Sequence, residues 1–159
     1  NNIGAVLSAM KGAHPYEEVA YDLIALENSN SQVGSGMIGE LPEPMDALEF
    51  LSQLKEAFNC GVIRYTALQN KPIRTVALCG GAGSFLLPQA IQQNADIFIS
   101  GDFKYHEFFG AENKILIADI GHYESEQYTS ALLVEIIREK FPTFAVRLTV
   151  NNTNPINFL

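Results

Sequence analysis

Two residues near the C-terminal end of the sequence have the types and the spacing that metal binding requires. His122 and Glu126 are four residues apart, and they follow the apolar run KILIADI. Residues at i and i+4 of a helix face the same way, so an imidazole nitrogen and a carboxylate oxygen can bind one metal ion together. A second interpretation stays open, in which His122 caps the start of a helix and Glu126 interacts favourably with its N-terminal dipole.

Asp102 and His106 repeat this spacing after another apolar run, DIFIS. They are candidates to orient a metal ligand, to hold a water molecule, or to act as a general acid or base. The alternative is a capping aspartate and a surface histidine. Because a catalytic zinc ion usually has three protein ligands and one open position, His122 and Glu126 need a further ligand from elsewhere.

A third junction is the glycine-rich stretch GGAGS, which ends at Ser84 and follows the apolar run TVALC. Backbone N–H groups can approach an anion closely at such a stretch, and the start of a helix favours negative charge. No GK[ST] follows, and the G-x-G-x-x-G spacing is not met. The stretch is therefore either part of a site for an anionic or metal-bound ligand or a plain tight turn.

The elements that must position these residues alternate along the chain. The pattern predicts helices over 44–58, 85–93, 105–111 and 129–140, and strands over 61–68, 73–79, 96–100, 114–120 and 144–150. This alternation predicts an α/β fold, a layered sheet with parallel crossovers flanked by helices. Ligands bind beyond the carboxyl ends of the strands in such sheets, so we expect the junctions described above to converge at one edge.

The N-terminal part has a different organisation. Apolar residues at helical spacing predict a helix over 3–11, and the run EEVAYDLIAL predicts a strand over 17–26 that has no partner strand of its own. A stretch rich in Asn, Ser, Gly and Pro follows. We therefore predict an N-terminal piece over 1–30, a linker over 31–43 and an α/β metal-binding domain over 44–159.

Composition excludes several functional classes. Of the 159 residues, 10 are Lys or Arg and 18 are Asp or Glu, which gives a net charge of −8. A general nucleic-acid binder or a binder of anionic membranes would need clustered basic residues. The sequence has neither the pattern of a signal peptide nor a membrane span, so a cytoplasmic protein is expected. Cys60 and Cys79 lack metal-type or redox spacing.

Five motifs in order resemble one family over nearly the whole chain. They are AHPYEEVAYDLIAL at 13–26, GSGMIGEL at 34–41, CGGAGSF at 79–85, ADIFISGDFKYHE at 95–107 and ADIGHYESE at 118–126. These segments resemble the GTP cyclohydrolase 1 type 2 homologues, the dinuclear-metal proteins also called NGG-interacting-factor-like. Met37 departs from the pattern, since many relatives carry Arg there.

The resemblance implies a two-metal site between two similar α/β halves. His122 and Glu126 match the family's ligands in the C-terminal half, and Glu124 is a weaker substitute for Glu126. The sequence is similar to that half, and residues 1–30 are similar to the tail of an inserted ferredoxin-like domain of the PII and CutA type. The family further implies homo-oligomers, toroidal hexamers with the metal sites facing an inner cavity.

The function implied is metal-dependent hydrolysis with two divalent ions of the zinc, iron or manganese type. In that reading His122 and Glu126 are metal ligands, and Asp102 and His106 support the ligands or transfer protons. The substrate is a small molecule that no residue in the sequence identifies. The rival hypothesis is a non-catalytic metal-binding scaffold or regulatory assembly protein.

Overall fold

The computed structural model describes residues 2–25 and 33–159. The chain divides into two compact units, Asn1–Gln32 and Val33–Leu159. None of the helices in the described ranges combines the length and the apolar character needed to cross a membrane.

The first unit contains one helix, α1 (Ile3–Ala13), in its described residues. This confirms the helix predicted at the start of the chain. The strand predicted over 17–26 is wrong for residues 17–25, which form no strand, and residue 26 lies outside the described residues. Alternating apolar residues are not sufficient, because a strand needs a neighbouring strand to satisfy its backbone groups.

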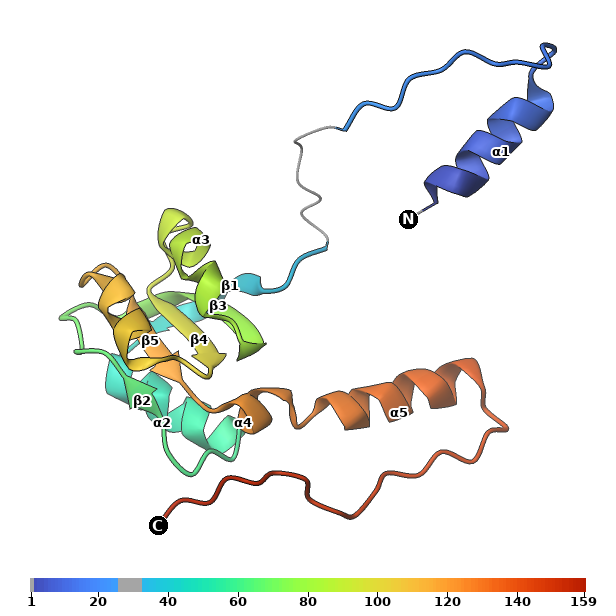
Figure 1. The fold of residues 1–159 in the computed structure, drawn as a ribbon. Coiled ribbons are helices and arrows are strands. Elements are labelled where there is room, and N and C mark those ends of the chain that lie inside the picture. Colours follow the sequence, from blue (N-terminus) through green and yellow to red (C-terminus); the bar gives the residue numbers. More distant parts are fainter. Residues whose placement is uncertain (1, 26–32) are drawn as a thin grey trace. The chain divides into compact units, whose positions relative to one another are not determined.

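The second unit is built around a sheet (Figure 1). In the labels used below, η marks a short 3-10 helix. The elements are β1 (Met37–Met45), α2 (Ala47–Ala57), β2 (Arg64–Tyr65), β3 (Ile73–Ala82), η1 (Ser84–Leu86), α3 (Leu87–Gln92), β4 (Ile97–Gly101), η2 (Tyr105–Ala111), β5 (Leu116–Asp119), α4 (His122–Glu126) and α5 (Thr129–Lys140). Within the described residues the strands form one sheet in the order β1-β3-β4-β5-β2. β3, β4 and β5 run parallel, and the two edge strands pair antiparallel. The predicted α/β class with a parallel centre is therefore confirmed.

Helices cover both faces of this sheet (Figure 1). On one face, α2 packs Leu51 and Leu54 against strand residues that include Ile97 and Ile99. On the other face, Leu87 of α3 packs in a cluster with Phe98 and Ile117. Successive residues of the central strands thus enter opposite cores, which explains why these short strands read as continuous apolar runs.

The predicted linker over 31–43 is wrong from residue 37 onward, because β1 occupies Met37–Met45; residues 31 and 32 lie outside the described residues. β1 lies at the edge of the sheet, and its pairing with β3 is regular to Glu40 and then shifts before Met45. Pro42 and Pro44 fall in this irregular stretch. A proline is tolerated at a sheet edge or bulge, so a Pro- and Gly-rich sequence can form a strand there.

Three other predicted boundaries also change. The strand predicted over 61–68 shrinks to Arg64–Tyr65, and β3 continues through the first residues of GGAGS to Ala82. The strand predicted over 144–150 does not form, and Val150 is fully exposed. Here again an alternating pattern has no neighbouring strand to pair with.

Candidate metal site at the ends of the parallel strands

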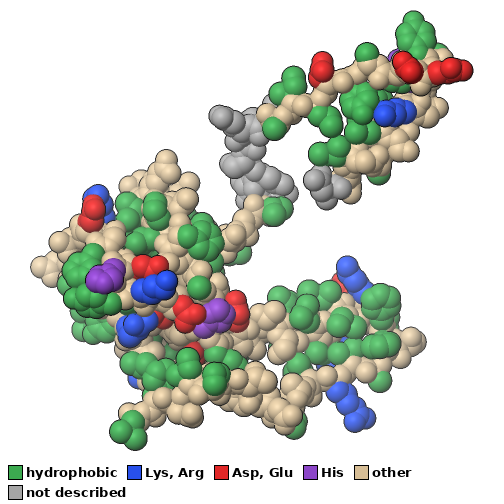
Figure 2. All heavy atoms as spheres, viewed as in Figure 1, with side chains coloured by type: hydrophobic (Ala, Val, Ile, Leu, Met, Phe, Trp, Pro, Cys, Tyr) green, Lys and Arg blue, Asp and Glu red, His purple; other side chains and the backbone are tan. Residues whose placement is uncertain are grey.

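The carboxyl ends of β4 and β5 place two of the predicted residues side by side. The two strands are paired up to Ser100 and Asp119, so the residues that follow them leave the sheet at the same edge. Asp102 comes directly after β4, and His122 begins α4 after β5. Figure 2 shows histidine and acidic side chains gathered on this unit. The structure thus brings together Asp102, His122 and Glu126.

His122 lies between two carboxylates. Its Nδ1 atom is 2.7 Å from Oδ2 of Asp102, and its Nε2 atom is 3.3 Å from Oε2 of Glu126. The hydrogen bond with Asp102 is the main cause that raises the pKa of His122 above its ordinary value; partial burial opposes the shift, and the charges of both carboxylates add to it. All three side chains are about half exposed, at 47% for His122 and 51% for each carboxylate, so solutes can reach them.

This geometry fits a metal ligand pair. Two ligand atoms that each lie about 2.1 Å from a tetrahedral zinc ion are about 3.4 Å apart, close to the 3.3 Å between Nε2 of His122 and Oε2 of Glu126. When Asp102 is ionised, Nδ1 donates to it and Nε2 keeps its lone pair for a metal. Asp102 therefore occupies the position of the carboxylate that commonly supports a metal-bound histidine.

Gly81, near the end of β3, leaves room for the side chains of His122 and Glu126. Gly81 has a left-handed backbone with φ of 64°. A Cβ atom on it would lie 2.6 Å from Oε1 of Glu126 and 3.3 Å from Cε1 of His122. The N–H of Gly81 also donates to Oγ of Ser125, which in turn donates to the carbonyl of His122. The glycine-rich stretch thus contacts the candidate metal ligands directly.

The structure does not place His106 with Asp102. Asp102 has a left-handed backbone, and η2 begins only at Tyr105, so the two residues do not share a helix. His106 is exposed, and its ring lies beside that of Tyr105. The prediction that the i, i+4 spacing would bring these two side chains together is therefore wrong, because that spacing has meaning only inside an α-helix.

Ser84 and Glu124 make contacts of other kinds. Oγ of Ser84 donates to Glu107, whose other oxygen accepts from the N–H of Lys104. Glu124 is buried, and it accepts from the side chain of Asn154 at 3.4 Å. A cavity of about 210 Å³ next to Glu124 is also lined by Asp102 and His122.

Sequence reasoning missed Arg64 and Asp119. Asp119 is only 3% exposed and forms an ion pair with Arg64 of the edge strand β2. It also accepts from the backbone N–H groups of Phe103 and Gly121, each at 3.0 Å. The one available signal was an aspartate at the end of an apolar strand. Asp119 ties together the two loops that carry Asp102 and His122.

Within residues 2–25 and 33–159 no group of three or more His, Cys, Asp or Glu side chains is arranged to hold a metal ion. The described residues therefore offer two candidate metal ligands, His122 and Glu126, with the carboxylate of Asp102 on the other ring nitrogen of His122. Zinc in catalytic sites usually has three protein ligands, so this set is incomplete by itself.

Comparison with known proteins gives the family. The family model for Duf34/NIF3 (NGG1p interacting factor 3) matches residues 7–155. The chain belongs to the Duf34/NIF3 family. Family relatives named GTP cyclohydrolase 1 type 2 homolog include a protein of Staphylococcus epidermidis, 32% identical over 99% of this chain, and one of Mycobacterium leprae, 36% identical over 96% of this chain. The chain spans 44% and 41% of the length of these two relatives.

Solved structures of the family have the same fold. A Bacillus cereus protein related to NIF3 is 32% identical and superposes with a TM-score of 0.71 over 99% of this chain and 44% of its own chain. The Staphylococcus aureus protein SA1388 is 27% identical, with a TM-score of 0.77 over 99% of this chain and 52% of its own. The sheet and its helices are therefore arranged similarly in this chain and in these two structures.

Proposed function

We propose that this chain binds a divalent metal ion of the zinc, iron or manganese type through Nε2 of His122 and a carboxylate oxygen of Glu126. The observation that carries the proposal is the position of His122, with Nδ1 held by Asp102 and Nε2 facing Glu126. A surface histidine that only caps a helix has no need of two carboxylates on opposite ring nitrogens.

The reaction class we propose is metal-dependent hydrolysis. A divalent ion bound here would lower the pKa of a water molecule and polarise the substrate. The chain's own contribution is to fix the imidazole: Asp102 sets its tautomer and orientation, and Gly81 leaves the space that the side chains of Glu126 and His122 occupy. Relatives named GTP cyclohydrolase 1 type 2 homolog are consistent with a hydrolase.

A second function, a metal-binding scaffold without catalysis, has one observation in its favour. The residues that the structure describes contain no third His, Cys, Asp or Glu ligand beside His122 and Glu126. Under either proposal the remaining coordination positions would be filled by water, by a substrate, or by residues from outside the described ones, including a second copy of the chain in a homo-oligomer.

Metal titration tests the proposal. Binding of Zn²⁺ and Mn²⁺ would be measured by calorimetry, with metal content checked by elemental analysis, for the wild type, His122→Ala, Glu126→Gln and the control His106→Ala. We expect the wild type and His106→Ala to bind alike and the other two variants to lose binding. Equal binding by all four proteins would overturn the assignment of these ligands.

Hydrolysis assays then separate the two functions. The metal-loaded wild type would be incubated with panels of nucleotides and phosphoesters. Turnover that disappears in His122→Ala supports the hydrolase. Metal binding without turnover on any panel member favours the scaffold.

A further inference from the structure

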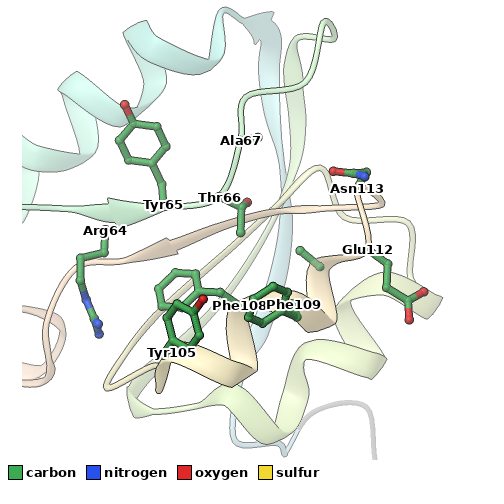
Figure 3. A pocket seen from close by; sticks show the side chains of 10 residues that line it. Arg64, Tyr65, Thr66, Ala67, Tyr105, Phe108, Phe109, Glu112 and Asn113 are labelled. Atoms are coloured by element: carbon green, nitrogen blue, oxygen red, sulfur yellow. The ribbon is translucent and has the colours of Figure 1, made fainter.

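A second and larger cavity is also lined by Arg64. It is open to solvent and has a volume of about 700 Å³ between η2 on one side and β2, with the residues that follow it, on the other. Figure 3 shows Thr66 and Ala67 on one side of this space and Tyr105, Phe108 and Phe109 on the other. Pockets that bind small organic ligands usually have volumes of roughly 300–1,000 Å³. The cavity therefore has the size of a small-molecule site.

Aromatic rings of η2 form one wall of this cavity. Tyr105 and Phe109 pack edge to face with ring centroids 5.4 Å apart, yet they are 72% and 64% exposed. Phe108 is less exposed and packs on the buried Phe103. Two large exposed rings beside an anchored one are costly to keep in water, and such a surface commonly marks a binding site.

Arg64 lies at one end of the wall, where its side chain is anchored by several contacts and is 55% exposed. Its guanidinium lies 5.4 Å from the centroid of Phe108, and its Nη2 donates to the carbonyl of Phe103 and to Asp119. Among the described residues, Nε and Nη1 of Arg64 have no acceptor in the protein. A fixed guanidinium with free N–H groups binds an oxyanion with little loss of side-chain entropy.

Other polar groups of the cavity fit the same kind of ligand. Oγ1 of Thr66 accepts from the N–H of Ile117 at 3.0 Å, so its own proton remains to be donated. Glu112, the acidic residue of the lining, is paired with Lys114. The lining thus combines flat apolar rings with hydrogen-bond donors from Arg64, the first residue of β2, and from Thr66, which follows that strand.

We propose that this cavity binds a planar aromatic compound that carries an oxyanion, with the ring against Tyr105, Phe108 and Phe109 and the oxyanion on Arg64. Arg64 also lines the smaller cavity beside Asp102 and His122. A compound bound here would therefore extend toward the candidate metal site. The binding itself does not depend on a metal at His122, so the proposal stands or falls separately from the proposed function.

The test uses the full chain without added metal and three probes. 1-Naphthyl phosphate has both ring and oxyanion, 1-naphthol has the ring alone, and inorganic phosphate has the anion alone. Binding of each probe would be measured by calorimetry. We expect 1-naphthyl phosphate to bind saturably and more tightly than either of the other two probes. If 1-naphthol binds as tightly as 1-naphthyl phosphate, the proposed role of Arg64 is overturned. If 1-naphthyl phosphate binds no more tightly than inorganic phosphate, the proposed role of the rings is overturned.

Variants locate the binding. Phe109→Ala removes an exposed ring and should weaken 1-naphthyl phosphate about three- to tenfold, the range expected for loss of one aromatic contact. Phe85→Ala is the matched control, because Phe85 is 61% exposed and does not line the cavity. In isotope-labelled protein, titration with the ester should shift the Nε–H signal of Arg64.

The rival occupant of this surface is a second copy of the chain. Phe109→Ala would then change the oligomeric state measured by analytical ultracentrifugation and leave probe binding unchanged, which overturns the proposal. An equal loss of probe binding in Phe109→Ala and Phe85→Ala would overturn it as well.

Discussion

Nδ1 of His122 and Oδ2 of Asp102 are 2.7 Å apart, although the two residues lie 20 positions apart in the sequence. The contact exists because β4 and β5 are parallel neighbours whose ends leave the sheet together. It fixes one ring nitrogen of His122 and directs the other to Glu126. This relationship leads to the first prediction.

Asp102→Asn should lower the pKa of His122. The hydrogen bond and the charge of Asp102 both raise this pKa, and asparagine keeps an acceptor but removes the charge. Asparagine also tolerates the left-handed backbone at this position, so the fold should be unchanged. Titration of the histidine ring signals by NMR measures the shift, with His106 as the internal reference. An unchanged His122 pKa would contradict the hydrogen bond.

Metal affinity should fall as the pH is lowered. Only the neutral imidazole binds a metal, and protonation of His122 competes with it. Because the pKa of His122 is raised above 6.5, this loss begins at a higher pH than for an ordinary histidine. Zn²⁺ dissociation constants would be measured at a series of decreasing pH values. As the pH falls, the dissociation constant should begin to rise at a higher pH in the wild type than in Asp102→Asn. Identical profiles would show that Asp102 does not influence the ligand.

Gly81→Ala should disturb the candidate site, whereas Gly80→Ala should not. A Cβ at Gly81 would collide with Glu126 at 2.6 Å in a backbone conformation that alanine avoids. A Cβ at Gly80 would meet Cγ of Glu126 at 3.5 Å, an ordinary contact. We expect metal binding to weaken at least about tenfold in Gly81→Ala alone. Equal affinities in the two variants would argue against the packing of Glu126 on Gly81.

Asp119→Ala should destabilise the fold. Asp119 is 3% exposed, and its removal leaves the N–H groups of Phe103 and Gly121 without their acceptor. We expect a loss of about 2–4 kcal/mol in the free energy of unfolding, measured by urea titration. The exposed Glu112, paired with Lys114 at the surface, provides the control Glu112→Ala, which should leave the free energy of unfolding nearly unchanged because exposed ion pairs contribute little to stability.

Cys60 should resist alkylation in the folded chain. Burial, with smaller contributions from nearby charges, raises the pKa of its thiol to about 11, so little thiolate exists at pH 8. Iodoacetamide at pH 8, followed by peptide mass spectrometry, should label Cys60 slowly before denaturation and rapidly after it. Labelling of the native chain at the rate of free cysteine would mean that the thiol is accessible and unshifted.

The sequence was a good guide where local patterns decide the structure. Continuous apolar runs marked β4 and β5, and the parallel order of these strands brought Asp102 and His122 to one edge as predicted. The pairing of Asp102 with His106 failed because Asp102 has a left-handed backbone and His106 lies in a 3-10 helix that begins only at Tyr105, so the two residues do not share an α-helix. The ion pair of Arg64 and Asp119 joins residues 55 positions apart, on strands whose antiparallel pairing no local pattern indicates.

Strands at the edge of the sheet were the second feature that the sequence did not predict correctly. β1 forms from a stretch with two prolines because proline, which has no N–H group to donate, is tolerated in an edge strand. Residues 144–150 do not form a strand although their pattern is suitable. In both cases the deciding factor is whether a neighbouring strand is present. That factor is a property of the whole fold, which a window of residues does not contain.

The end of β4 also sets how precisely the acidic and imidazole groups meet. A Cβ at Gly101 would lie 2.8 Å from backbone atoms of Gly121 and from the N atom of His122. Two segments of the backbone, at Gly101 and at Gly121, therefore touch at this point with only hydrogen atoms between them. One added methyl group would force these two segments apart, so the contact between Asp102 and His122 that raises the pKa of His122 depends on a residue that has no side chain at all.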